Sequence, residues 1–141
     1  MNVLLSIKPK YAELIKAGFK KYEFRRKISK KFGGSKVYIY STSPIKKIIG
    51  VFDASIIHVD FPDKIWGLFG ENSGISEEEF FQYFRGCKTA YAIEIRNLVI
   101  FDKPHDPSNY FMEFTPPQSY RYFTPHQNLL PFRKRFETAE A

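Results

Sequence analysis

The sequence is poor in the residues that build disulfides and metal sites, and it has no long apolar run. Its single cysteine, Cys87, cannot form a disulfide within the chain, and no second cysteine or close pair of histidines provides the spacing of a zinc site. No uncharged stretch approaches the ~20 residues that cross a bilayer, and the apolar stretch after Met1 is too short for a signal-peptide core. We therefore expect a soluble, cytoplasmic protein with no disulfide, metal, cofactor or membrane partner.

The chain also lacks an evident histidine-based catalytic pair. His58 falls in a buried-looking strand, where a core or edge histidine is the simpler interpretation, and His105 and His126 fall in proline-rich loops. None of them has a serine or cysteine partner that the sequence reveals. Cys87 is interpreted as a small buried residue rather than a reactive thiol. These features disfavour conventional nucleophilic catalysis.

Positive charge is abundant and unevenly spread. Residues 1–50 hold 13 Lys or Arg against 2 acidic residues, whereas residues 51–141 hold 9 basic against 13 acidic residues. A basic segment of this kind is typical of proteins that bind a polyanion, because Lys and Arg neutralise phosphates and release counterions. A solvated basic surface that keeps the protein soluble is the alternative interpretation.

Periodicity predicts a strand, a helix and a second strand near the start of the chain. Residues 2–7 form the first strand; Pro9 suits the first turn of a helix over residues 9–17, which Gly18 ends in a left-handed conformation. From Lys20 onward the apolar period changes to two. This change predicts a half-buried strand, with Tyr22 and Phe24 on its inner face and a charged outer face of Lys21, Glu23 and Arg25.

The rest of the chain alternates strands with short helices. The predicted elements are a strand over 37–42, a long strand over 46–60 with a bulge at Gly50, helical turns over 62–69, a helix with a Ser76–Glu79 capping box that Gly86 ends, and a strand over 88–101 that either continues or divides near Asn97. From about residue 102, prolines and aromatics predict a loop-rich wrap tied down on the body. The expected fold is α+β, with about five or six mostly antiparallel strands, two or three helices, and a small mixed barrel as the architecture. One domain is expected to cover residues 1–141.

The segment GFKKYEFR carries a recognisable pattern. Gly18, Lys20, Glu23 and Arg25 fit G-x-K-x-x-E-x-R after the first helix, and LLSIKPKYAELI, YIYSTSP, TAYAIEI and PPQSYRYF follow in the matching order. In these features the chain, over roughly residues 2–125, resembles the ASCH family of the PUA-like superfamily. The resemblance implies a PUA-like β-barrel with a cleft beside the first helix, lined by the motif, and a role connected with RNA or modified nucleosides.

Some ASCH proteins are ribonucleases, and one small bacterial branch looks like an amidohydrolase acting on N4-acetylcytidine. In that branch the lysine that matches Lys20 is the base, and a threonine nucleophile follows three residues later. Here that position is Glu23, which is not an acyl-accepting hydroxyl. The amidohydrolase mechanism is therefore not transferred.

The chemistry of the motif residues fits an anion or nucleotide site. Lys20 could hold an anion or, if partly desolvated, act as a base with a lowered pKa. Arg25 or Arg26 could clamp a phosphate bidentately, and Glu23 could accept a hydrogen bond from a base. The alternative is that Glu23 and Arg25 form an exposed ion pair worth under about 1 kcal/mol.

Further polar residues are candidates for the same site. Ser6 and Lys8 leave the first strand near the helix start, where backbone N–H groups bind anions, although a solvated cap is the commoner role of a lysine such as Lys8. Tyr40, Ser41 and Ser43 end a strand and offer hydroxyls and a stacking ring, although core packing explains a tyrosine there equally well. Gln118, Ser119 and Tyr120 follow a rigid Pro-Pro turn that could present them to a pocket, although capping of the turn is the commoner role of such residues.

Three functions are compatible with these residues. The first is a binding module that recognises single-stranded RNA or a nucleotide, with one base entering a cleft of Lys20, Glu23 and Arg25. The second is a metal-independent ribonuclease or nucleoside-directed hydrolase with Lys20 as base, Glu23 nearby and Tyr40 or Ser43 as helper. The third is a domain that works beside a DNA-binding regulator, since ASCH-like domains accompany helix-turn-helix domains and this chain has no convincing pair of its own.

Overall fold

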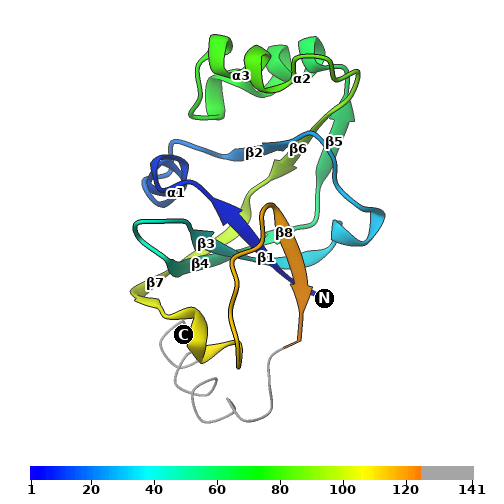
Figure 1. Ribbon diagram of the computed structural model, residues 1–141. Helices are drawn as coiled ribbons and strands as arrows, with labels where there is room; N and C mark the ends of the chain where they lie inside the picture. The colour runs from blue at the N-terminus through cyan, green and yellow to red at the C-terminus, as the bar shows by residue number, and fades with distance from the viewer. Residues whose placement is uncertain (125–141) are drawn as a thin grey trace.

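The computed structural model describes residues 1–124, which form strands, α-helices and single 3-10 turns (Figure 1). His126, assigned above to a proline-rich loop, lies outside the described residues. The described part contains eight strands: β1 Asn2–Ile7, β2 Tyr22–Arg25, β3 Ser35–Ser41, β4 Lys47–Ala54, β5 Ile57–Asp60, β6 Ala90–Glu94, β7 Arg96–His105 and β8 Tyr120–Phe123. Its three α-helices are α1 Pro9–Lys16, α2 Pro62–Phe69 and α3 Glu77–Tyr83. None of the helices in this part is long and apolar enough to cross a membrane.

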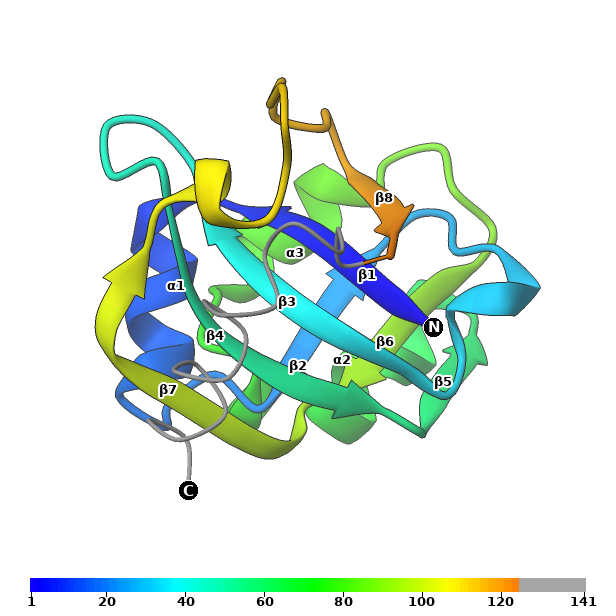
Figure 2. The same ribbon diagram turned by 90° about the horizontal axis from the view of Figure 1, so that it is seen from below.

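The strands form two sheets. The large sheet has the order β7-β4-β3-β1-β8 and the small sheet the order β2-β6-β5. β1 pairs with β3 in parallel, and every other pairing is antiparallel, so the mostly antiparallel arrangement is confirmed. Figure 2 shows the five strands of the large sheet side by side, with the small sheet behind them. Hydrogen bonds do not join the two sheets of the described residues into a ring, and the expected barrel is not confirmed.

The chain crosses between the sheets at two breaks in predicted strands. The strand over 46–60, predicted as continuous, divides at residues 55–56, where the chain leaves β4 of the large sheet for β5 of the small one. The strand over 88–101, predicted either to continue or to divide near Asn97, divides at Ile95, two residues before Asn97 with its φ of 51°. These two corners and the additional strand β8 give more strands than the five or six expected.

Three apolar clusters hold these layers together. The inter-sheet cluster joins β1, β3, α1 and Ile93 of β6, and the helical cluster packs Phe24 and β6 against α2 and α3. The wrap cluster lies where the segment after β7 covers the large sheet, with Tyr110, Phe111 and Phe123 buried against Leu4. The predicted wrap is therefore tied down as expected, although its end forms β8, a strand that the sequence analysis missed.

Several local signals act as the sequence predicts. Pro9 opens α1, and Gly18 follows the helix with φ of 86°. Ser76 caps α3 by accepting a hydrogen bond from the backbone N–H of Glu79 at 3.1 Å. In β4 the register shifts next to Gly50, where an added Cβ would lie 2.5 Å from the carbonyl oxygen of Val99. Close approach of β7 thus accounts for the glycine inside this strand.

Candidate functional site

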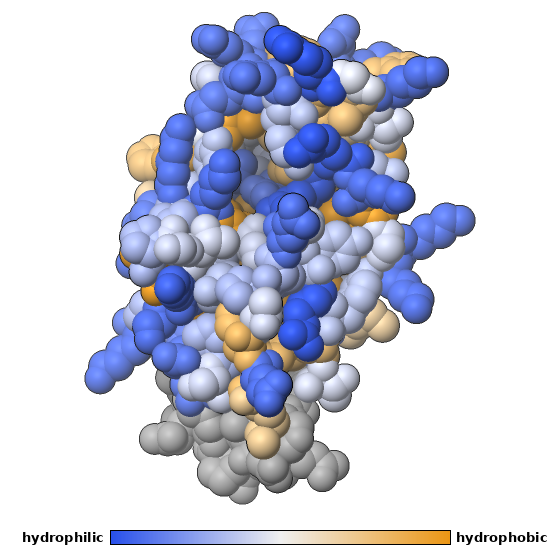
Figure 3. Space-filling view, in the orientation of Figure 1, coloured by the Kyte–Doolittle hydropathy of each residue, from blue (hydrophilic) through white to orange (hydrophobic). Residues whose placement is uncertain are grey.

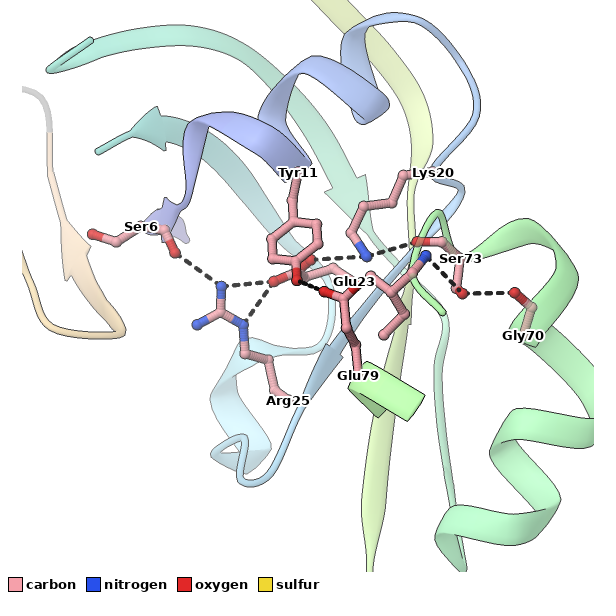
Figure 4. Close-up of polar contacts among 9 residues, drawn as sticks. Ser6, Tyr11, Lys20, Glu23, Arg25, Gly70, Ser73 and Glu79 are labelled. Atoms are coloured by element: carbon pink, nitrogen blue, oxygen red, sulfur yellow. Dashed lines mark hydrogen bonds and ion pairs between the residues drawn. The ribbon is translucent and has the colours of Figure 1, made fainter. Parts of the chain in front are cut away.

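The charged face of β2 points into the protein. The sequence predicts Glu23 and Arg25 on an exposed face, but Glu23 is only 6% exposed and the Arg25 side chain 13%. This prediction was wrong because α1 and the segment over 70–79 cover that face, while Phe24 packs on the opposite side in the helical cluster. The prediction that Lys21 is exposed is confirmed. Glu23 and Phe24 are therefore buried on opposite faces of β2, and Figure 4 shows the ionic face.

Lys20 is a buried cation. Its side chain is 2% exposed, and Nζ donates a hydrogen bond to the Ser73 carbonyl oxygen at 2.8 Å and lies 3.5 Å from Oε1 of Glu23. The segment that covers it packs closely, since a Cβ added at Gly74 (φ +72°) would lie 3.1 Å from Cβ of Lys20. Burial lowers the pKa of the Lys20 ammonium, and the Glu23 carboxylate opposes this shift.

Glu23 fixes the position of Arg25. Oε2 of Glu23 accepts from Nε of Arg25 at 2.9 Å and from Nη2 at 2.7 Å, and Nη2 also donates to the carbonyl oxygen of Ser6 at 2.9 Å. The guanidinium is therefore held on one edge by a carboxylate and by the end of β1. Its Nη1 makes one long contact with the described residues, at 3.3 Å with the hydroxyl of Ser119, an exposed residue. Two charge-assisted bonds to one carboxylate make this a strongly oriented arginine.

A second carboxylate approaches from α3. The Tyr11 hydroxyl donates to Oε2 of Glu79 at 2.6 Å, and Lys10 Nζ lies 3.3 Å from the same oxygen. Burial and the bond to Glu79 raise the pKa of Tyr11 to about 12, while the bond from Tyr11 lowers the pKa of Glu79. Nζ of Lys20 lies 5.4 Å from the centre of the Tyr11 ring. Tyr11 thus links the buried Lys20 to the helical segment that covers it.

We expect the alkaline titration of Tyr11 to have a midpoint at about 12. Because its pKa in the folded protein is raised above the ordinary 10.0, the stability contributed by this group is present below pH 10 and is lost as the pH rises through 12. The measurement is the difference in phenolate absorbance between wild type and Tyr11→Phe. Glu79→Gln should move the midpoint down, and a midpoint already near 10 in the wild type would contradict the contact.

The structure brings some of the predicted site residues together and separates others. Lys20, Glu23, Arg25 and Ser6 form one cluster, in which the Ser6 hydroxyl donates to the carbonyl oxygen of Pro117 at 2.7 Å. Lys8 and Ser43 are exposed, and their side chains form no hydrogen bond with another residue in the described part of the chain.

Tyr40 and Ser41 are not available as the sequence analysis expected. Both are 2% exposed, and the Tyr40 ring packs against Phe114 in the wrap cluster, with 5.2 Å between ring centres. Since Tyr40 and Leu4 face the wrap while Ile39 and Leu5 face the inter-sheet core, the alternation of the strands turns Tyr40 away from α1. We therefore correct the expectation that this ring stacks on a base or assists Lys20.

The positions of His58 and Cys87 test two further predictions from the sequence. His58 lies on β5, the edge of the small sheet, with Nε2 3.1 Å from Oε2 of Glu94, so the edge interpretation is confirmed. Cys87 is partly exposed beside the helical cluster, and its expected burial was wrong. Within residues 1–124 no group of three or more His, Cys, Asp or Glu side chains could hold a metal ion.

Three neighbours of the motif were not predicted from the sequence: Tyr11, Ser73 and Glu79. Tyr11 was predicted only as part of the apolar stripe of α1, and Glu79 only as a capping residue. The pairing of Tyr11 with Glu79 joins residues 68 positions apart. No spacing in the sequence indicates such a contact, whereas the capping box did indicate that Glu79 lies in the first turn of α3.

Comparison with known proteins agrees with this geometry. Residues 5–98 match the model of the ASCH domain. The chain belongs to the ASCH domain family. This ASCH chain is 30% identical over 124 residues to an ASCH domain-containing ribonuclease from Zymomonas mobilis, with 84% of this chain and 81% of the relative covered.

Solved structures show a similar fold. The crystal structure of ASCH from Zymomonas mobilis superposes with a TM-score of 0.82 at 25% identity, covering 95% of this ASCH chain and 94% of the other. The N-terminal domain of Staphylothermus marinus McrB reaches a TM-score of 0.54 at 14% identity, covering 98% of this chain and 92% of the other, a likeness of fold alone. The family and its mixed α+β fold are thereby shown.

Proposed function

We propose that this ASCH protein binds single-stranded RNA, with Arg25 holding a phosphate at the mouth of the buried cluster. The observation that carries the proposal is the state of the Arg25 guanidinium. Glu23 and Ser6 occupy Nε and Nη2, so that the remaining N–H groups of Nη1 face the exposed Ser119 with one long contact. An arginine that is fixed in place loses little conformational entropy when it binds a phosphate.

The surrounding charge supports a polyanionic ligand. Of the 13 basic residues in positions 1–50, only Lys20 is buried, and ten are exposed. Hydrophilic side chains project over much of the face shown in Figure 3. Exposed lysines on this scale attract phosphates at long range and release counterions on contact. The name of the Zymomonas relative, an ASCH domain-containing ribonuclease, supports RNA as the class of polyanion.

Glu23 orients the proposed phosphate site from below the surface. Its Oε2 accepts two hydrogen bonds from Arg25, while its Oε1 lies 3.5 Å from Nζ of Lys20. Because Glu23 is only 6% exposed, we place no base contact on it. In this proposal a phosphate lies on Arg25, and Glu23 holds the guanidinium in place.

The test is binding of a single-stranded RNA of about ten nucleotides, measured by fluorescence anisotropy at several salt concentrations. We expect the logarithm of the binding constant to fall linearly with the logarithm of the salt concentration. A duplex of the same sequence should bind more weakly, since its bases are paired and stacked and are not free to contact the protein. Equal affinity for both forms, or binding that does not change with salt, would overturn the proposal.

Cleavage of RNA is the second candidate, and Lys20 favours it. Burial lowers the pKa of its ammonium, which increases the fraction of neutral amine available as a base near neutral pH. The named activity of the Zymomonas relative points to the same class of reaction. Turnover of single-stranded RNA by the purified protein, lost in Lys20→Met with binding retained, would establish it. Binding without turnover would leave the protein as a binding module.

A further inference from the structure

We infer that Arg26 and Tyr83 form a second nucleotide site, a stacking platform for the base next to the one at Arg25, so that the ligand is an oligonucleotide rather than a free nucleoside. The inference rests on the proposed function. The guanidinium carbon of Arg26 lies 4.5 Å from the centre of the Tyr83 ring. Arg26 is exposed and Tyr83 half-buried.

The platform is already ordered by its packing. Tyr83 ends α3 and packs edge-on against Phe84, with 4.8 Å between ring centres and an interplanar angle of 76°. Phe84 is 3% exposed and belongs to the helical cluster. A planar guanidinium held over such a ring presents a flat, charged surface on which a base can stack. The contact costs little ordering of side chains when RNA binds.

Arg26 keeps its charge free for a ligand. In the part of the chain that the structure describes, Arg26 forms no ion pair and no side-chain hydrogen bond. Arg25 lies opposite Tyr91 in the pairing of β2 with β6, so the residues after β2 run beside those just before β6. Lys27, Arg85 and Lys88 are exposed in these two segments. Positive charge therefore lies in the chain segments next to the platform, and none of these four basic residues forms an ion pair within the described part of the chain.

The platform and the proposed phosphate site are built on neighbouring residues of the chain. Arg25 and Arg26 are consecutive, with Cα atoms about 3.8 Å apart. Their side chains leave the chain in different directions, one toward Ser6 and the other toward Tyr83. Because β2 is an edge strand of the small sheet, a single RNA strand can cross it without meeting a neighbouring strand. A phosphate on Arg25 and a base on Arg26 are then contacts of one continuous chain.

The platform predicts a preference for purines that depends on Arg26. Adenine stacks more strongly than uracil, so an oligoadenylate of about ten nucleotides should bind more tightly than an oligouridylate of the same length. Arg26→Lys keeps the charge but removes the plane, and we expect it to weaken oligoadenylate binding about tenfold and to abolish the preference. Tyr83→Phe should retain the preference and Tyr83→Leu should lose it.

Arg121 provides a matched control. Its guanidinium carbon lies 4.7 Å from the Phe111 ring centre, a contact of the same kind on the large sheet. Arg121→Lys should leave the preference for adenine intact. An unchanged preference in Arg26→Lys, or an equal loss in Arg121→Lys, would overturn the platform while RNA binding itself stands. Failure of the wild type to bind either oligonucleotide would instead overturn the proposed function, and the platform with it.

Discussion

We expect Glu23→Gln to lower the free energy of unfolding by about 3–5 kcal/mol, the usual result when one partner of a buried ion pair is removed. The carboxylate lies between two cations, 3.5 Å from Lys20 Nζ and 2.7 Å from Arg25 Nη2. Glutamine has nearly the same shape, so the loss comes from charge and not from a cavity. Lys20 is then left with one backbone carbonyl as its hydrogen-bond acceptor among the described residues.

The pH dependence distinguishes this cause from simple misfolding. The pKa of Lys20 is already lowered by burial, and loss of the Glu23 charge should lower it further. A lysine with a depressed folded-state pKa binds its proton more tightly in the unfolded chain, so stability rises with pH between the folded-state pKa and the ordinary 10.5. The deficit of Glu23→Gln should therefore shrink as the pH rises through this window.

Chemical denaturation of both proteins at neutral and alkaline pH measures this effect. Glu94→Gln is the matched control, because the Glu94 carboxylate on the neighbouring β6 is 25% exposed and has two more exposed partners, His58 at 3.1 Å and Arg96 at 3.6 Å. We expect it to cost under about 1 kcal/mol, as exposed ion pairs do. Two results would refute the role assigned to the buried Glu23 carboxylate between Lys20 and Arg25. One is an equal decrease in the free energy of unfolding in Glu23→Gln and Glu94→Gln, and the other is a decrease in Glu23→Gln that does not change with pH.

Arg25→Lys should weaken single-stranded RNA binding by about ten- to a hundredfold. Lysine keeps the positive charge but cannot bind Glu23, Ser6 and a phosphate at the same time through a planar group. Since the net charge does not change, the slope of binding against salt should stay close to that of the wild type. The experiment therefore distinguishes loss of the planar guanidinium at Arg25 from loss of its positive charge.

Arg96→Lys is the control for that experiment. Arg96 is an arginine on the surface, with its side chain 48% exposed, and it forms one long ion pair. Its replacement should leave the affinity for RNA within about twofold of the wild-type value, as expected for a residue that contributes only to the positive electrostatic field of the surface. Thermal unfolding of both variants establishes that the binding measurements are made on folded protein. An affinity of Arg25→Lys equal to that of Arg96→Lys would remove Arg25 from the site.

Local signals in the sequence predicted much of the fold. Pro9 begins α1, Gly18 follows its end, Ser76 caps α3, and Gly50 lies at a bulge. These features were predictable because each depends on a few neighbouring residues. The corner at residues 55–56 was not predicted, and the corner at Ile95 was predicted only as an alternative near Asn97. Their apolar residues continue a strand pattern, and only the packing of two sheets determines where the chain turns.

The site was predicted in its motif but not in its surroundings. The pattern of Lys20, Glu23 and Arg25 identified the right strand, and periodicity assigned their face to solvent. That error is instructive, because a charged face normally marks exposure. Here the opposite charges satisfy one another, and Tyr11 and Glu79 help to cover them. Long-range contacts of this kind leave no spacing in the sequence.

The most direct test of the proposal is nuclear magnetic resonance of the arginine Nε–H groups during titration with single-stranded RNA of about ten nucleotides. We expect the Nε–H signal of Arg25 and the backbone amide signals of Ser6 and Ser119 to shift together and to saturate, while the Arg96 signal stays unchanged. Saturable shifts confined to other parts of the protein, with Arg25 unaffected, would show that the ligand binds elsewhere and would contradict the account.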